Sequence, residues 1–328
     1  MFKLLLRHVP LFAMLSACLS LSACKDADEL NVELMEKRLA EVGAHPEHPY
    51  SYIQNHPLPL GKQTLKVLSI GNSFTQDALW FVSDLLETAD VDAQSYSIYY
   101  VSHEAASLQY WWGQAESGTR LAAHHLAGLR MTQESGTLAE LLAQDWDVIT
   151  LQQNSENSIL YASFHPYLHH LIDFIQQHCL NPDVTLAWLM AWSYNDGDFH
   201  PWTNYERWLL IARTTVQMVQ EDGIDVVIPV GTAIQNARKT TLNSKSQLTS
   251  DGWHLDTGIG RYIAACTWVE TLFGAVYGMS VNGNTALTQT SDAPSQRYPS
   301  QPVTEENRPI AWQCAIDAVV SPFQITPL

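Results

Sequence analysis

The hydrophobic positions from Leu65 onward alternate between short apolar runs and longer helical patterns. Continuous apolar runs are typical of parallel strands that are covered on both faces. They predict five strands, at Leu65–Ile70, Ser95–Val101, Asp147–Leu151, Val184–Leu189 and Asp225–Val230. Strands that alternate with helices predict an α/β fold, with a doubly wound parallel sheet in three α/β/α layers.

Helical patterns fill the intervals between these strands. A single apolar stripe makes Pro166–Cys179 the clearest of them. Three further helices are predicted at Thr203–Gln220, Asp256–Phe273 and Thr304–Val320. Because no internal repeat interrupts this order, we expect one domain over residues 63–328.

Residues 1–24 have the pattern of an export signal. Two basic residues precede the apolar run Val9–Ala23, which is shorter than the ~20 residues that a membrane-spanning helix needs. The run ends at Leu21-Ser-Ala-Cys24, which resembles the lipobox of bacterial lipoproteins; the same letters occur at Leu15–Cys18. The resemblance implies that Cys24 becomes a lipid-modified N-terminus and that the protein is exported and anchored to a bacterial membrane, at the periplasmic or the outer surface. An ordinary secretory signal is the alternative.

Residues 25–62 are expected to form a tether followed by an extension that lies on the domain. Leu30, Leu34 and Leu39 could line a short helix, whereas His45-Pro and His56-Pro break regular structure.

The composition is strongly acidic, with 34 Asp and Glu residues against 17 Lys and Arg. This balance argues against a nucleic-acid partner, because phosphates need clustered positive charge. Beyond the export signal, Cys179, Cys266 and Cys314 form neither a metal spacing nor a disulfide framework. One disulfide among the three could form in an oxidising compartment.

A hydroxyl lies where the first predicted strand meets its helix, in Gly71-Asn-Ser73. The carboxyl ends of the strands form the ligand crevice of open α/β sheets, so Ser73 is a candidate nucleophile. The alternative is a capping box, because Gln76 follows Ser73 by three residues.

A serine nucleophile needs a base, and Asp251-Gly-Trp-His254 offers one after the last predicted strand. Asp251 could orient one imidazole nitrogen of His254 and leave the other to face a serine. The alternative is a turn-forming Asp251 and a half-buried His254. Side-chain amides at Gln152, Gln153 and Asn154 follow the middle strand and could stabilise an oxyanion or cap their own loop.

Together these motifs resemble the SGNH (GDSL-type) hydrolases, most closely a poorly characterised branch of exported bacterial lipoproteins. Gly71-Asn-Ser73 is similar to the first block of the family, and Asp251-x-x-His254 to the last. The resemblance implies a flavodoxin-like five-stranded parallel sheet and a Ser73-His254-Asp251 triad. The amide of Ser73 is then one donor of the oxyanion hole.

The resemblance also implies two further oxyanion donors. Asn154 aligns with the asparagine of the third block, but Gln152 replaces its glycine, so the neighbouring glutamines Gln152 and Gln153 could share or take over the role. The second block normally supplies a glycine amide, and His103–Leu108 contains none. The amide of Ala105 or of Ala106 is the expected substitute.

Enzymes of this type usually cleave esters, often acetyl groups on carbohydrates, so the implied partner is a small-molecule or polysaccharide ester. Aromatic residues near the expected site could stack on sugar rings: Trp111, Trp192, Tyr194 and Trp253. A non-catalytic glycan-binding surface lipoprotein and an O-acyltransferase are the alternative functions.

Two histidines four residues apart, His165 and His169, have a spacing that metal ligands can have on a helix. No third ligand accompanies them in the sequence, so we expect them at the surface. We therefore expect no metal and no cofactor.

Overall fold

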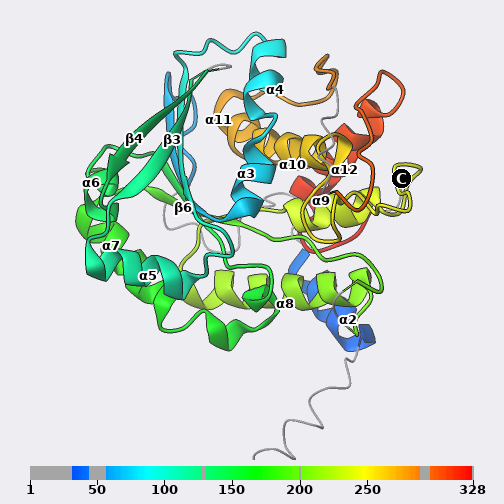
Figure 1. Ribbon diagram of the computed structural model, residues 1–328, viewed down its shortest axis with the longest axis horizontal. Helices are drawn as coiled ribbons and strands as arrows, with labels where there is room; N and C mark the ends of the chain where they lie inside the picture. The colour runs from blue at the N-terminus through cyan, green and yellow to red at the C-terminus, as the bar shows by residue number, and fades with distance from the viewer. Residues whose placement is uncertain (1–31, 44–56, 128–129, 199–200, 289–295, 327–328) are drawn as a thin grey trace, which may run out of the picture.

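The computed structural model of the chain describes residues 32–43, 57–127, 130–198, 201–288 and 296–326 (Figure 1). The export signal with Cys24, and also His45 and His56, lie outside these described residues.

A seven-stranded mixed sheet forms the centre of the molecule, in the order β4-β3-β2-β1-β5-β6-β7. The strands are β1 (Leu65–Gly71), β2 (Tyr96–Ser102), β3 (Leu121–Ala127), β4 (Arg130–Gly136), β5 (Val148–Leu151), β6 (Thr185–Leu189) and β7 (Val226–Ile228). The neighbours β2, β1, β5, β6 and β7 pair in parallel, and each lies where an apolar run predicted a strand.

The expected sheet of five parallel strands is incomplete, because the observed sheet has seven strands and is mixed. The hairpin β3–β4 pairs antiparallel with β2 and extends that edge. The sequence pattern missed it because β3 carries two histidines, and the side chains of residues 132–135 on β4 are exposed. An edge hairpin that is solvated on one face lacks the continuous apolar run of a buried strand.

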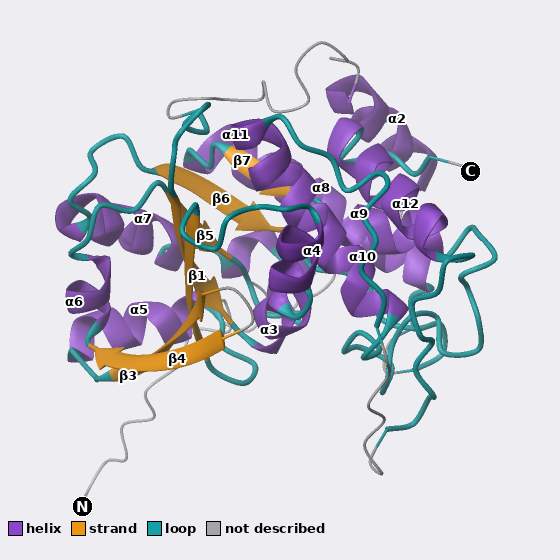
Figure 2. Cartoon of the chain, turned by 90° about the horizontal axis from the view of Figure 1, so that it is seen from above, coloured by secondary structure: helices purple, strands orange, loops and turns teal. Residues whose placement is uncertain are grey.

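Helices cover both faces of the sheet (Figure 2). They are α2 (Val32–Gly43), α3 (Ser73–Leu79), α4 (Val82–Thr88), α5 (Leu108–Ser117), α6 (Leu138–Leu142), α7 (Tyr167–His178), α8 (Asn204–Asp222), α9 (Val230–Ala237), α10 (Ile259–Trp268), α11 (Ala275–Tyr277) and α12 (Arg308–Val320). Short turns of other helix types are η1 (Asn157–Ile159), η2 (Tyr161–Ser163) and the π-helical η3 (Val269–Gly274).

Two hydrophobic cores result, one on each face of the sheet. Side chains of α3, α4, α9, α10 and α12 pack on one face. Those of α2, α5, α6, α7 and α8 pack on the other. Alternate residues of β1 point to opposite cores, Leu65 and Val67 to the first and Leu68 and Ile70 to the second. The molecule therefore has the expected three layers.

The extension before the sheet is partly folded onto the domain. α2 packs on α8, and its Met35 and Leu39 are buried there, while Leu34 is 43% exposed. Among the described helices, none combines the length and apolarity that crossing a bilayer requires.

The three cysteines beyond the export signal are free thiols. Cys266 and Cys314 are buried and Cys179 is half-buried. A disulfide among them, left open by the sequence, is not formed.

Candidate active site

Asn72, rather than Ser73, caps the helix that begins at the end of β1. Its Oδ1 accepts a hydrogen bond from the backbone amide of Phe74 at 2.9 Å. The capping-box alternative for Ser73 is wrong, because Gln76 instead donates to Ser102 Oγ at 2.7 Å. The hydroxyl of Ser73 is therefore available for chemistry at the first position of α3.

Gly71 is needed because the chain has no room for a side chain there. A Cβ at this position would lie 2.1 Å from Thr75 Oγ1 and 2.8 Å from Gln152 Cδ. Thr75 Oγ1 donates to Gln152 Oε1 directly beneath the turn, so a larger residue would break this buried contact.

The loop that carries His254 is shaped by its own Asp251. Asp251 Oδ1 accepts hydrogen bonds from the amides of Trp253 at 3.0 Å and His254 at 2.8 Å. Gly252, which lies between Asp251 and Trp253, has a φ of 111°, a conformation that L side chains rarely adopt. The sequence Asp-Gly-Trp-His thus folds into a tight turn that holds the carboxylate beside the imidazole.

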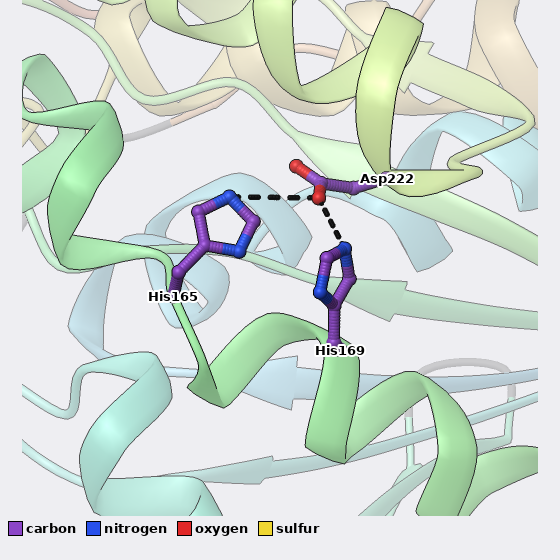
Figure 3. A group of neighbouring side chains, drawn as sticks. All are labelled: His165, His169 and Asp222. Atoms are coloured by element: carbon purple, nitrogen blue, oxygen red, sulfur yellow. Dashed lines mark ion pairs between the residues drawn. The ribbon is translucent and has the colours of Figure 1, made fainter.

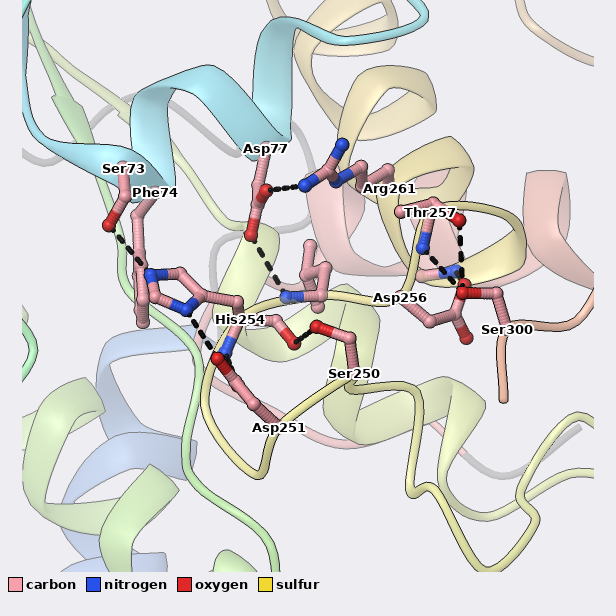
Figure 4. A network of polar contacts seen from close by, with 12 residues as sticks. Ser73, Phe74, Asp77, Ser250, Asp251, His254, Asp256, Thr257, Arg261 and Ser300 are labelled. Carbon is pink, nitrogen blue, oxygen red and sulfur yellow. Dashed lines mark hydrogen bonds and ion pairs between the residues drawn. The ribbon is translucent and has the colours of Figure 1, made fainter. Parts of the chain in front are cut away.

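Ser73, His254 and Asp251 form a continuous hydrogen-bonded chain (Figure 4). His254 Nε2 lies 2.9 Å from Ser73 Oγ, and His254 Nδ1 lies 2.7 Å from Asp251 Oδ2. All three residues are half-buried. The structure therefore brings together the three residues that the motifs predicted as a triad, although they come from opposite ends of the domain sequence.

The electrostatics of the pair suit a base. Burial is the largest influence and disfavours the imidazolium, but the hydrogen bond with Asp251 and the negative charges of Asp77 and Asp251 together outweigh it and raise the pKa of His254 above 6.5. Burial also opposes ionisation of Asp251, yet its hydrogen bonds with His254 and two backbone amides lower the pKa of this carboxyl below 3.8. Asp251 is therefore charged near neutral pH and can stabilise an imidazolium.

Asp77 supports the imidazole loop from α3, a role that the sequence reasoning missed. Its Oδ2 accepts a hydrogen bond from the amide of Leu255 at 2.9 Å, and its Oδ1 pairs with Arg261 Nη2 at 2.8 Å (Figure 4). Asp77 thus ties the residue after His254 to the helix that begins with Ser73. The available signal was a carboxylate on a helix face that otherwise carries apolar residues, because a buried charge needs partners.

The predicted oxyanion donors Asn154 and Ala105 lie next to each other. Each follows the carboxyl end of a strand that neighbours β1, β5 for Asn154 and β2 for Ala105. Asn154 Nδ2 donates to the carbonyl of Ala105 at 3.2 Å, which leaves its second N–H for a ligand. Ala105 has a φ of 53°, the left-handed conformation that glycine adopts most easily.

Ala106 is a weaker substitute than Ala105, because its amide already donates to the carbonyl of His103 at 3.1 Å. The left-handed φ of Ala105 also explains physically why a glycine was expected at this place in the sequence.

Gln153 does not fit the predicted oxyanion role. It is buried, and its Oε1 accepts hydrogen bonds from the amides of Leu108 at 3.1 Å and Asn154 at 2.9 Å. Its Nε2 faces Ser163 at 3.3 Å. Gln152 is also buried, and its Nε2 donates to Asn72 Oδ1. Both glutamines therefore hold the strand exits together instead of facing a ligand.

Three of the four aromatic residues that were predicted to stack on sugar rings are buried. Trp111 and Trp192 are 1% and 0% exposed and Tyr194 is 6% exposed, so none presents a ring face to a sugar. Trp192 instead stacks on Phe74 with a centroid distance of 3.8 Å and donates from Nε1 to the carbonyl of Trp253. It therefore supports the loop that carries His254.

Two other aromatic groups are better placed for a ligand. Trp253 is half-buried beside His254, with 5.6 Å between the ring centroids. The exposed ring of His103 stacks on the half-buried ring of Tyr110 at 4.5 Å, and the amide of His103 faces the carbonyl of Gly71. No sequence pattern predicted that His103 and Tyr110 would pair.

The site has the geometry of a serine-hydrolase site. A hydroxyl, an imidazole and a carboxylate are hydrogen-bonded in series at the carboxyl edge of an α/β sheet. A model of the DUF4886 family, described as a domain of unknown function, matches residues 66–294 of the chain. The protein belongs to this family.

The solved structure of a DUF4886 family protein from Bacteroides uniformis is similar to this chain. The two are 27% identical with a TM-score of 0.68, over 81% of this chain and 98% of that one. Among curated proteins, none matches the sequence.

More distant solved structures are also similar. A putative GDSL-like lipase from Parabacteroides merdae is 14% identical, with a TM-score of 0.46 over 66% of this chain and 98% of that one. The acetylxylan esterase Axe2 from Geobacillus stearothermophilus is 12% identical, with a TM-score of 0.45 over 66% and 95% of the two chains.

Proposed function

We propose that this protein is a serine esterase that hydrolyses acyl esters, with Ser73 as the nucleophile. The observation that carries the proposal is the hydrogen-bonded chain from Ser73 Oγ through both nitrogens of His254 to Asp251. In it His254 is the base, and Asp251 fixes its tautomer and stabilises the imidazolium.

In the first half of the reaction, Ser73 Oγ attacks the ester carbonyl and His254 Nε2 takes its proton. The tetrahedral oxyanion lies near the start of α3, where the amide of Ser73, the free N–H of Asn154 and the amide of Ala105 are the candidate donors. When the intermediate collapses, the C–O bond to the alcohol breaks and His254 returns the proton to the leaving oxygen.

In the second half, water attacks the acyl group on Ser73 and gives its proton to His254. The carboxylic acid is released as the bond to Ser73 Oγ breaks, and the serine regains its proton. Donors that are already in place are worth several kcal/mol at this stage, because they do not have to reorganise.

For the substrate we propose short acyl esters, acetyl esters in particular, on a carbohydrate. The triad residues are half-buried, so each is partly accessible from solvent. The rings of Trp253 and of the His103–Tyr110 stack flank the site and offer apolar faces to a sugar. A lipid anchor at Cys24 would keep this activity at the cell surface or in the periplasm.

A fluorophosphonate probe tests the proposal directly, because it phosphonylates an activated serine and displaces fluoride. We expect one adduct on the purified wild-type protein, located at Ser73 by peptide mass spectrometry, and none on Ser73→Ala. Ser117→Ala, which removes an exposed hydroxyl at the end of α5, should label as the wild type does. Glycan binding without labelling of Ser73 would overturn the esterase proposal in favour of a binding protein.

The pH dependence of the reaction should report the raised pKa of His254. The base must be neutral to accept the proton of Ser73, so kcat/KM should fall as the pH drops through the His254 pKa. Because that pKa is raised, half-maximal activity should occur above pH 6.5 rather than at or below it. Initial rates on an aryl acetate between acidic and alkaline pH check this, and a midpoint below 6.5 would contradict it.

A further inference from the structure

His165 and His169 meet a third potential metal ligand, Asp222, which is distant in the sequence (Figure 3). His165 lies just before α7, His169 lies in the first turns of α7, and Asp222 is the last residue of α8. The expectation that no third ligand accompanies the two histidines is therefore wrong. We propose that these three side chains bind a divalent transition-metal ion of the zinc type.

The ligand atoms are already gathered around one point. Asp222 Oδ1 lies 2.6 Å from His169 Nε2 and 3.5 Å from His165 Nε2, and all three ligand atoms lie within 4.8 Å of one another. Zinc binds such atoms at about 2.0–2.2 Å, which places neighbouring ligands of a tetrahedral site roughly 3.3 Å apart. Side-chain shifts of less than about 1 Å would therefore admit the ion.

The carboxylate is held as a ligand would be. The side chain of Asp222 is only 1% exposed, and its Oδ2 accepts a hydrogen bond from the hydroxyl of Tyr161 at 2.9 Å. Its Oδ1 accepts no well-aligned hydrogen bond from the described residues, despite its closeness to both imidazoles. Ligands of one metal have this relation, because their lone pairs point at the ion and not at one another. The hydrogen bond from Tyr161 to the other oxygen orients the carboxylate.

The local charge also favours a cation. Glu221 and Asp222 end α8, at the negative end of the helix dipole, and no basic residue lies in the last turn. The rings of Tyr161 and His165 pack edge to face, with 4.9 Å between centroids, and the Tyr161 hydroxyl also reaches Glu221 at 2.8 Å. A cation would offset the two carboxylates.

The donor set indicates which ions bind. Two imidazoles and one carboxylate suit Zn²⁺, Co²⁺, Ni²⁺ or Fe²⁺, whereas Ca²⁺ and Mg²⁺ prefer sites made entirely of oxygen. Three protein ligands leave a fourth position, which water can fill. The bound ion would join the start of α7 to the end of α8 and fix the far end of the segment that begins at Asn154. This site stands apart from the triad and does not depend on ester hydrolysis.

The test is titration of the full, untagged chain with Zn²⁺ by calorimetry after treatment with EDTA, with Mg²⁺ as the comparison ion. We expect one zinc site per chain, and about 100-fold weaker binding in His169→Gln and in Asp222→Asn. Tyr161→Phe should weaken binding about 10-fold, because it removes the hydrogen bond that orients the Asp222 carboxylate. His178→Gln, a half-buried histidine at the other end of α7, is the matched control and should bind as the wild type does.

Two further readouts make the result decisive. Zinc should raise the melting temperature of the wild type but not of His169→Gln, which should fold because His169 is 53% exposed. Cobalt in place of zinc should give a visible spectrum that this variant lacks. Equal zinc affinity in the wild type and His169→Gln, no zinc binding at all, or equal affinity for Mg²⁺ would overturn the proposal.

Discussion

Replacing Ser73 with alanine should lower kcat for hydrolysis of an aryl acetate by on the order of 10⁵- to 10⁶-fold. The alanine removes the atom that attacks the carbonyl, and His254 then has no hydroxyl to deprotonate. The remaining activity would come from water in a site that keeps its oxyanion donors. Acetate release from an aryl acetate and from acetylated xylan measures the effect, with the aryl substrate as a reference for chemistry without sugar contacts.

Folding should survive this change, because Asn72 rather than Ser73 caps α3. The circular dichroism spectrum and the melting temperature of Ser73→Ala should therefore match those of the wild type. The control variant Ser117→Ala should match the wild type in these properties and also in its rate of hydrolysis. Equal acetate release from the wild type and a folded Ser73→Ala would exclude Ser73 as the nucleophile. Transfer of the acyl group to an added sugar, instead of its release, would mark an O-acyltransferase.

Replacing Asp251 with asparagine should lower kcat by about 10⁴-fold while leaving the loop in place. An asparagine can keep accepting the amide hydrogens of Trp253 and His254 through its Oδ1. Its NH₂ group, however, would donate to His254 Nδ1, so the ring proton would move to Nε2 and face Ser73. The imidazole would then be unable to accept the proton of the nucleophile.

Steady-state kinetics between pH 5 and 9 check this prediction about the tautomer, because the lost rate should not return at any pH in that range. Asp173→Asn, an exposed aspartate on α7, is the control for the loss of one negative charge and should retain the wild-type rate. A fall of less than about 10-fold in Asp251→Asn would mean that the carboxylate only shapes the turn.

The sequence predicted the parts of the fold that local apolarity encodes. The five parallel strands are buried on both faces, so each appears as an apolar run near its observed bounds. The prediction failed at α9, because Val230, the first residue of this helix, was assigned to the preceding strand. Every residue of α9 is buried, so this helix has no polar face to reveal its period.

The candidate site shows the same division. The resemblance of the first and last motifs to a known family was enough to predict that Ser73, Asp251 and His254 meet, and they lie within hydrogen-bond distance. The orientation of Gln153 and the burial of Trp192 depend on neighbours from other segments, which no local pattern contains. Asp222 is invisible as a partner of His169 for the same reason.

The side chain of Asn72 has a thermodynamic consequence for ligand binding. It joins three segments, because it accepts from the amide of Phe74 and from Gln152 Nε2 and donates to the carbonyl of Ala106 at 3.1 Å. The conformational entropy of arranging these loops is therefore lost when the chain folds, and not when a ligand arrives. The affinity for an ester should then reflect its own contacts with the site, with little reduction for the ordering of loops around Ser73.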